Sequence, residues 1–298
     1  MFFDTHMNIC TAVLPKFSFN DSVDIAIQSG YQGIELRVNS NYHKSLEELD
    51  NEGRFLRHKL ERAGLAVPVL TSYLPVDDEE SVDKLLRGAE KMGVPKVRLV
   101  LPRSCHASVS RLAHVKEIIP SYEALQEPNE LMITLRKTLR QLERKAYKAG
   151  VKVLLELHWG TVMSSFSSAY FLVHDLDPDC IAITFDPANM MVEGKEDWEF
   201  GIKLIRPHLA NVHVKNMNWK VTPDGWAWEW APLNRGMVDW NELISLLEQN
   251  QYVGDYAMED FLVPNTDKES AIAYLRQARS EFHDIYLRAT NSEQLAAS

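Results

Sequence analysis

Val151–His158 reads VKVLLELH and decides the fold. Side chains alternate between the two faces of a strand, so the odd-numbered positions of this run form one wholly apolar face. The even-numbered positions form the other face, which ends in Glu156 and His158. Helices would cover the apolar face. A face that becomes charged only at its C-terminal end is typical of a barrel strand, because active sites of α/β barrels lie at that rim.

Three later strand-like runs end in the same way. Ile181–Asp186 places Asp186 on its inner face, residues 210–215 place His213 and Lys215 there, and residues 255–260 place Glu259 there. The C-terminal ends of parallel barrel strands meet at one rim. We therefore expect these side chains to converge with Glu156.

Strand-like and helix-like segments alternate along the whole chain, and glycines follow several helical patterns as C-caps would. This alternation predicts a single (β/α)8 TIM barrel over residues 1–290, with residues 291–298 as a frayed C-terminal tail. A doubly wound sheet is the structural alternative. The expected strands lie near residues 7–13, 33–38, 66–72, 96–101, 151–158, 181–186, 210–215 and 255–260, and the expected helices near 20–30, 45–63, 79–92, 121–149, 165–175, 196–206, 240–250 and 267–288.

The 298 residues are 45% hydrophobic and 25% charged, which is ordinary for a globular protein with a large core. A net charge of -10 argues against a nucleic-acid partner, which would favour basic patches. No apolar run approaches the roughly 18 residues that span a bilayer, so no membrane association is expected. The start of the chain lacks secretory features, and Cys10, Cys105 and Cys180 fit buried thiols in a reducing compartment. We expect a cytoplasmic protein.

The converging side chains make a mostly oxygen donor set of three carboxylates and one imidazole. Such a set suits one divalent ion, with Mn²⁺ expected first and Mg²⁺, Co²⁺ or Zn²⁺ as alternatives. Burying these like charges together without a cation would be very costly. The predicted metal ligands are Glu156, Asp186, His213 and Glu259.

Several stretches, in this order, resemble the xylose-isomerase-like barrel enzymes, often called the sugar phosphate isomerase/epimerase family. They are Gly30–Arg37, Leu155–His158, Thr184–Asn189, His213–Lys215, Gly236–Trp240 and Tyr252–Glu259. The resemblance implies that the four predicted ligands bind a divalent metal. It also implies an isomerase or epimerase of carbohydrate metabolism that acts on a keto-sugar or related polyol ketone by way of an enediolate. Glu156 and Glu259 would then be the general acid/base pair.

Further candidates surround this set. His158 and Lys215 are expected to be catalytic, as a proton carrier and a neutralising cation. Asn189 stands where some epimerases of the family carry a histidine, which argues against strict ketose 3-epimerisation. The predicted substrate contacts are Glu35, Arg98, Asn189 and Trp219, with Arg37 and His6 as further candidates.

Four of the seven tryptophans lie between Trp219 and Trp230. We predict a long loop here at the active-site end. Its rings would stack on a sugar or cyclic ring, form a subunit interface, or simply pack the loop.

A lyase on the same scaffold is the main alternative, namely a dehydratase of an inosose or a dehydroshikimate-like ketone, or a 3-keto-glycoside β-eliminase. Its chemistry differs only after proton abstraction, when a β-hydroxyl leaves and His158 protonates it. An endonuclease IV-like phosphodiesterase would need more histidines in a metal-binding pattern. A non-catalytic metal or sugar-binding protein would leave the two glutamates without a purpose. Self-association into a homo-oligomer is an expectation by analogy alone.

Overall fold

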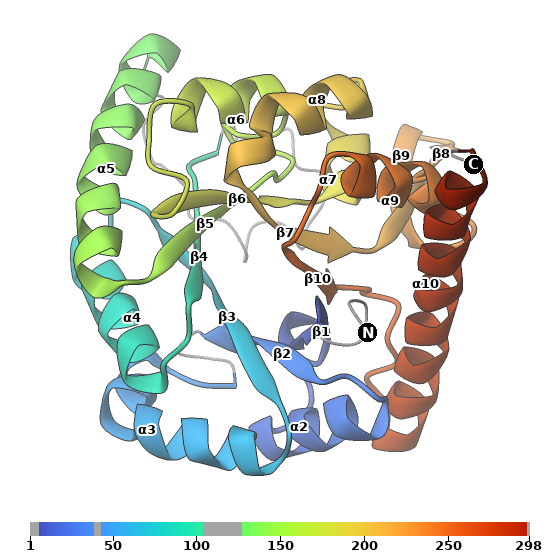
Figure 1. Cartoon of the computed structure of the whole chain (residues 1–298), viewed down its shortest axis with the longest axis horizontal. Coiled ribbons are helices and arrows are strands. Elements are labelled where there is room, and N and C mark those ends of the chain that lie inside the picture. Colours follow the sequence, from blue (N-terminus) through green and yellow to red (C-terminus); the bar gives the residue numbers. More distant parts are fainter. Residues whose placement is uncertain (1–5, 39–42, 104–126, 297–298) are drawn as a thin grey trace.

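The computed structural model describes residues 6–38, 43–103 and 127–296 of the chain. Parallel strands close into an eight-stranded barrel in the order β1-β10-β7-β6-β5-β4-β3-β2, and helices surround it (Figure 1). The predicted TIM barrel is therefore confirmed. The barrel strands are β1 (Met7–Cys10), β2 (Gly33–Val38), β3 (Ala66–Pro75), β4 (Lys96–Val100), β5 (Lys152–Glu156), β6 (Ile181–Phe185), β7 (Leu209–Val214) and β10 (Asp255–Met258).

Local capping signals define the helix ends. Ser45 and Glu48 form a reciprocal capping box at the start of one helix, and Gly93 and Gly150 end two others in the left-handed conformation that glycine adopts without strain. The helices are α2 (Phe19–Gln28), α3 (Leu46–Arg62), α4 (Glu79–Met92), α5 (Pro128–Ala149), α6 (Phe166–Val173), α7 (Pro187–Val192), α8 (Trp198–Ile205), α9 (Trp240–Gln249) and α10 (Lys268–Ala296), with short 3-10 turns at Thr11–Val13 and Arg206–His208.

The strands separate two apolar layers, as their alternation predicts. Outward residues such as Val153 and Ile183 join the large core between strands and helices. Inward residues Val69, Leu154 and Ala182 form a small separate plug inside the barrel, with Ala210 packed against it. Side chains placed beyond this plug on the same inward faces must therefore lie at the C-terminal rim.

The tryptophan-rich segment is a β-hairpin, so the predicted loop is wrong. Strand β8 (Asn216–Thr222) pairs antiparallel with β9 (Gly225–Ala231), and Trp219 lies opposite Trp228. Gly225 adopts a φ of 112° at the turn, a conformation that residues with a Cβ rarely adopt. Cross-strand pairing satisfies the backbone hydrogen bonds that a loop would have left to solvent.

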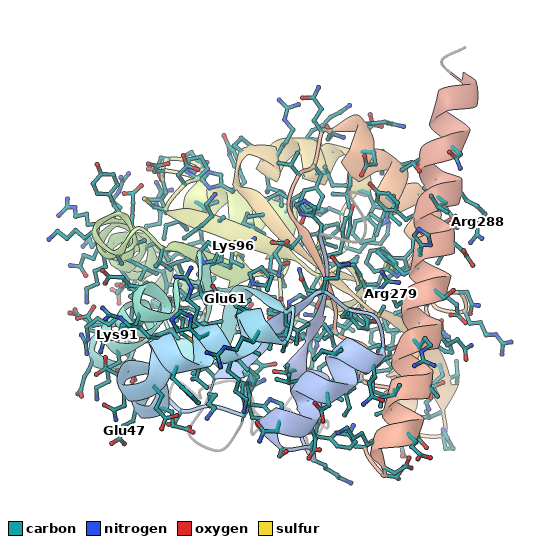
Figure 2. All side chains as sticks on the ribbon, turned by 60° about the horizontal axis from the view of Figure 1, so that its bottom comes forward. Glu47, Glu61, Lys91, Lys96, Arg279 and Arg288 are labelled. Carbon is teal, nitrogen blue, oxygen red and sulfur yellow. The ribbon has the colours of Figure 1, made fainter. Side chains whose placement is uncertain are left out.

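Charged side chains such as Glu47 and Lys91 project from the outer helices (Figure 2). Within the described ranges, none of the helices is both long and apolar enough to cross a membrane. Cys10 and Cys180 are buried free thiols, as expected, and Cys105 lies outside the described residues. Helix α10 extends to Ala296, and fraying of the tail after Thr290 stays a prediction.

Candidate metal centre

Four barrel strands bring the predicted metal ligands to one point. Glu156 is the last residue of β5, Asp186 and Glu259 directly follow β6 and β10, and His213 is the penultimate residue of β7. One donor atom from each of the four lies within 4.8 Å of the others. All four side chains are buried. The structure therefore brings these four side chains together at the rim, as strand alternation predicts.

The imidazole of His213 stands at the centre of the cluster. Its Nδ1 lies 3.0 Å from Glu156 Oε1, 3.2 Å from Glu259 Oε2 and 3.6 Å from Asp186 Oδ2. Its Nε2 faces the other way, 3.2 Å from Glu35 Oε1. A carboxylate on one ring nitrogen fixes the tautomer and orientation that let the other nitrogen bind a metal.

Glu35 is therefore placed behind the imidazole. It has no exposed surface, and its second oxygen accepts a hydrogen bond of 3.1 Å from Asn211 Nδ2. The sequence predicts Glu35 as a substrate contact, and this stays a prediction. In the structure one of its oxygens faces His213 and the other faces Asn211, so we propose that Glu35 also positions His213.

Two buried cations contact the ligand carboxylates. Arg98 pairs with Glu156 through Nη1 and donates a hydrogen bond of 3.2 Å from Nη2 to the Ser72 carbonyl oxygen. Lys215 Nζ lies 2.7 Å from both Asp186 Oδ2 and Glu259 Oε2. Arg98, predicted as a substrate contact, and Lys215, predicted as a catalytic cation, thus both contact carboxylates of the predicted metal ligands.

The charges of this cluster do not balance. Its four buried carboxylates, Glu35, Glu156, Asp186 and Glu259, outnumber by two the cations paired with them, Arg98 and Lys215. A proton on His213 would offset one of these two negative charges, whereas a metal-binding His213 is neutral and leaves both. Buried charge without a counterion is strongly unfavourable. One divalent cation would balance the excess. The oxygen-rich donor set also matches the ligands that Mn²⁺, Mg²⁺ and Co²⁺ prefer.

The electrostatics of the cluster keep two of its carboxylates, Glu156 and Glu259, ionised. Burial raises the pKa of Glu156, but Arg98 and His213 outweigh it and hold the pKa well below its usual range. His213 and Lys215 do the same for the pKa of Glu259. Burial lowers the pKa of His213, yet the surrounding carboxylates, Glu259 first, raise it well above its ordinary value. The cluster therefore attracts positive charge, either as a proton on His213 or as a metal ion.

The start of helix α7 ties two ligands together. Asp186 caps this helix by accepting a hydrogen bond of 2.9 Å from the Asn189 backbone N–H. The Asn189 side chain in turn donates a hydrogen bond of 3.3 Å to Glu156 Oε1. Asn189, predicted as a substrate contact, is buried and touches a ligand carboxylate, so it helps to orient Glu156.

His158 is half-buried and lies two residues after Glu156, past the end of β5. Its Nδ1 is 2.7 Å from the Trp159 carbonyl oxygen. Burial lowers its pKa, so the ring is neutral at neutral pH, with the proton on Nδ1 and a lone pair on Nε2. This is the state of a proton acceptor, which suits the predicted catalytic role.

The remaining candidates lie farther out. Trp219 donates a hydrogen bond of 3.0 Å from Nε1 to the Met191 carbonyl oxygen, which fastens the hairpin to α7. The sequence interpretation missed Tyr73. The guanidinium carbons of Arg37 and Arg98 lie 3.6 Å and 4.4 Å from the centroid of its ring. Strand alternation from Val69 through residue 71 would have placed Tyr73 on the inner face.

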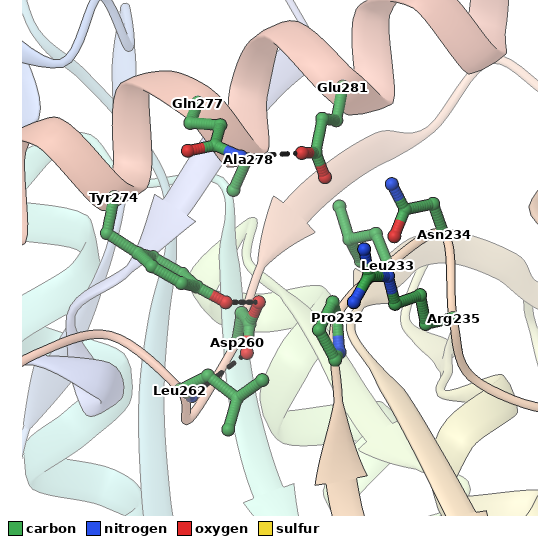
Figure 3. A pocket seen from close by; sticks show the side chains of 10 residues that line it. All are labelled: Pro232, Leu233, Asn234, Arg235, Asp260, Leu262, Tyr274, Gln277, Ala278 and Glu281. Carbon is green, nitrogen blue, oxygen red and sulfur yellow. Dashed lines mark hydrogen bonds between the residues drawn. The ribbon is translucent and has the colours of Figure 1, made fainter.

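A cavity of about 290 Å³ is lined by Asp260, the residue that follows Glu259 (Figure 3). Asp260 follows Glu259 and points to the opposite side, where it accepts hydrogen bonds of 2.6 Å from Tyr274 and 2.9 Å from the Leu262 N–H. The cavity lies between Pro232–Arg235 and helix α10, and none of the four metal ligands lines it. It is therefore separate from the rim site.

A family profile described as xylose isomerase-like TIM barrel matches residues 23–278, so the chain belongs to this family. The 3-dehydroshikimate dehydratase of Bacillus anthracis is 21% identical over 248 residues, which cover 76% of this chain and 80% of that protein. The apo crystal structure of 3-keto-D-glucoside 4-epimerase from E. coli has a TM-score of 0.68 at 15% identity, covering 94% of this chain and 99% of the other. The crystal structure of the IOLI protein with a bound zinc atom has a TM-score of 0.71 at 15% identity, and the match covers 95% of this chain and 99% of the IOLI chain. The family and these relatives indicate an enzyme.

Proposed function

We propose that this protein is a divalent-metal-dependent isomerase or epimerase of a keto-sugar or related cyclic polyol ketone. One observation carries the proposal. Glu156 and Glu259 approach the same imidazole nitrogen of His213, at 3.0 Å and 3.2 Å, from two different strands of a buried rim with excess negative charge. Two carboxylates at one metal site offer a proton acceptor and a proton donor for opposite faces of one carbon. The 3-keto-D-glucoside 4-epimerase relative supports this class of reaction.

Glu156, Asp186, His213 and Glu259 would hold the ion, with Mn²⁺ expected first. When bound, a divalent ion polarises a substrate carbonyl and makes the adjacent C–H more acidic. Glu156, kept ionised by Arg98, takes the proton in the base form. Glu259, after taking up a proton from solvent, would deliver it to the other face and so invert the carbon, while Glu156 would release its proton to solvent. Lys215, beside Glu259, places a positive charge where negative charge develops on the substrate.

Solvent exchange tests the proposal. Wild-type protein with Mn²⁺ should exchange a substrate C–H proton in deuterated water with at least one of a panel of ketoses, inososes, dehydroshikimate and 3-keto-glycosides. Glu156→Gln and Glu259→Gln should each slow this exchange at least about 100-fold, because each removes one proton carrier. Glu229→Gln, an exposed carboxylate on the hairpin, is the matched control and should exchange normally. Proton exchange at the wild-type rate in Glu156→Gln or in Glu259→Gln would contradict the proposal.

A dehydratase is the second candidate, and His158 favours it. Its neutral ring can take the C–H proton at Nε2 and return it to a departing β-hydroxyl, so that water leaves and a carbon–carbon double bond forms. The 3-dehydroshikimate dehydratase relative supports this reading. New ultraviolet absorbance from a conjugated enone would identify elimination, whereas interconversion of isomers without it would identify epimerisation. His158→Asn should remove the enone signal if elimination is the reaction.

A further inference from the structure

Four aromatic side chains form a continuous row at the rim, which we call the aromatic row: Trp159, Trp228, Trp230 and Phe261. Ring centroids are 5.5 Å apart for Trp159 and Trp228, 4.8 Å for Trp228 and Trp230, and 5.2 Å for Trp230 and Phe261. The members come from the segment after β5, from β9 and from the segment after β10. Segments distant in sequence thus supply one surface.

The aromatic row meets the candidate metal centre at both of its ends. Trp159 packs against His158, with ring centroids 5.4 Å apart. At the other end, Lys215 Nζ lies 5.0 Å from the Trp230 ring centroid and 5.2 Å from that of Phe261. The same ammonium group contacts Asp186 and Glu259. The row therefore borders the reaction site and is not a remote packing feature.

The hairpin that carries half of the row is held in place before any ligand arrives. The Asn216 side chain donates hydrogen bonds of 2.8 Å and 2.9 Å to the carbonyl oxygens of Leu233 and Val238. A Cβ at Gly236 would collide with Asn216, so this clamp requires glycine there. Trp219 adds the hydrogen bond to α7. Rings fixed in advance lose little conformational entropy on binding, which favours affinity.

The aromatic row also keeps surface for a ligand. Phe261 is 37% exposed, and the three tryptophans are half-buried. A small-molecule site usually combines apolar walls with a few convergent polar groups. Here the apolar wall is the aromatic row and the polar groups are the metal ligands. This division matches a molecule with a flat apolar part and a polar reacting part.

The charges beside the ligands favour an uncharged molecule. Among the described residues, Arg98 and Lys215 are the cations that contact the metal ligands, and both are bound to carboxylates. Both positive charges are therefore already paired, so neither cation offers an unpaired charge to a phosphate group. A phosphorylated open-chain sugar would also present no ring face to the tryptophans.

We propose that the aromatic row selects a cyclic keto-glycoside, an unphosphorylated pyranose ring with a planar apolar aglycone. This inference rests on the proposed function, because it assumes that the ketone reacts at the metal centre. Trp228 and Trp230 bind the ring and aglycone, and an open-chain ketose lacks the surface that they recognise. Aromatic stacking then determines which ketone reaches Glu156 and Glu259.

Binding of unoxidised probes tests the row separately from the reaction. Isothermal titration of the Mn²⁺-loaded protein with phenyl and methyl β-D-glucopyranoside should show tighter binding of the phenyl probe. Trp228→Leu and Trp230→Leu should each weaken phenyl binding about tenfold, the value of one good aromatic contact. Trp230→Phe keeps a ring and should retain most of the affinity. Trp226→Leu, on the same hairpin but 72% exposed and outside the row, is the matched control and should bind like wild type.

Equal affinity of wild type for the two probes would overturn the inference. So would unchanged phenyl binding in Trp230→Leu, or an equal loss in Trp230→Phe and Trp230→Leu. Proton exchange in deuterated water is measured in parallel on the 3-keto forms of both probes. Absent exchange with retained, tryptophan-dependent phenyl binding would refute the proposed reaction and leave the aromatic row as a binding surface.

Discussion

Two polar clusters occupy opposite ends of the same barrel, and strand β10 contributes a carboxylate to each. At its start, Asp255 pairs with Lys96 and lies 3.5 Å from His6 Nδ1 and 3.4 Å from Asn8 Nδ2. Just after its end, Glu259 joins the rim cluster. Asp255 and Lys96 balance each other, whereas the rim carboxylates outnumber the Arg98 and Lys215 cations paired with them by two. His6, considered as a site residue from sequence, therefore belongs to the end of the barrel opposite the ligands.

The difference separates stability from function. Polar groups at the N-terminal end of an α/β barrel serve the fold, and groups at the C-terminal rim serve chemistry. A cluster whose charges balance needs no added ion. An unbalanced buried cluster favours an added cation, so we propose that the rim holds an ion that the other end does not require.

The largest expected effect is stabilisation by metal. Mn²⁺ at about 100 times its dissociation constant should raise the free energy of unfolding by about 2.7 kcal/mol and the Tm by several degrees. Differential scanning calorimetry with Mn²⁺ and with a chelator measures this. Asp186→Asn, which loses one ligand, should show no such rise. An unchanged Tm in wild type would mean that the rim cluster, like the cluster at the opposite end of the barrel, does not bind Mn²⁺.

A somewhat smaller effect is expected from the residue behind the imidazole. Glu35→Gln removes the charge that orients His213 and should weaken Mn²⁺ binding about 10–100-fold. Competition with a chelating dye measures the affinity. Asp255→Asn is the matched control, since it removes a carboxylate from the balanced cluster, and its affinity should stay at the wild-type value. Equal affinities in Glu35→Gln and wild type would remove Glu35 from the metal centre.

The smallest effect is expected at the opposite end of the barrel. Lys96→Met leaves the slightly exposed Asp255 without its cation and should lower the free energy of unfolding by about 1 kcal/mol, measured by urea denaturation. Because the balanced cluster contributes no ligand, Mn²⁺ affinity should not change. A large loss of metal affinity in Lys96→Met would show that the two ends are coupled.

The rim ligands could be predicted because their positions depend on local pattern. Strand alternation assigns Glu156, Asp186, His213 and Glu259 to inward faces, and parallel strands end at one rim.

The sequence also contains a pattern that predicts the hairpin and that the sequence interpretation did not use. Trp226, Trp228 and Trp230 alternate with period two next to a Pro-Asp-Gly turn, which is typical of a β-hairpin.

The supporting contacts could not be predicted in the same way. Glu35 meets His213 across 178 residues of chain, and Arg98 meets Glu156 on the neighbouring strand. These pairings depend on strand register and on the path of long side chains across the barrel, which no local pattern specifies. The sequence predicts the like charges of the four ligands, but the cations paired with them and the fourth carboxylate, Glu35, became visible only in the structure.

Metal stoichiometry shows whether the rim cluster, unlike the cluster at the opposite end, takes up a divalent ion. Isothermal titration of Mn²⁺ into chelator-treated wild type and Asp186→Asn, with Asp255→Asn as control, compares the two clusters in one measurement. Balancing two excess charges requires one divalent ion per chain in wild type and in Asp255→Asn, with binding more than about 100-fold weaker in Asp186→Asn. The absence of saturable binding in wild type, or wild-type affinity in Asp186→Asn, would contradict the account.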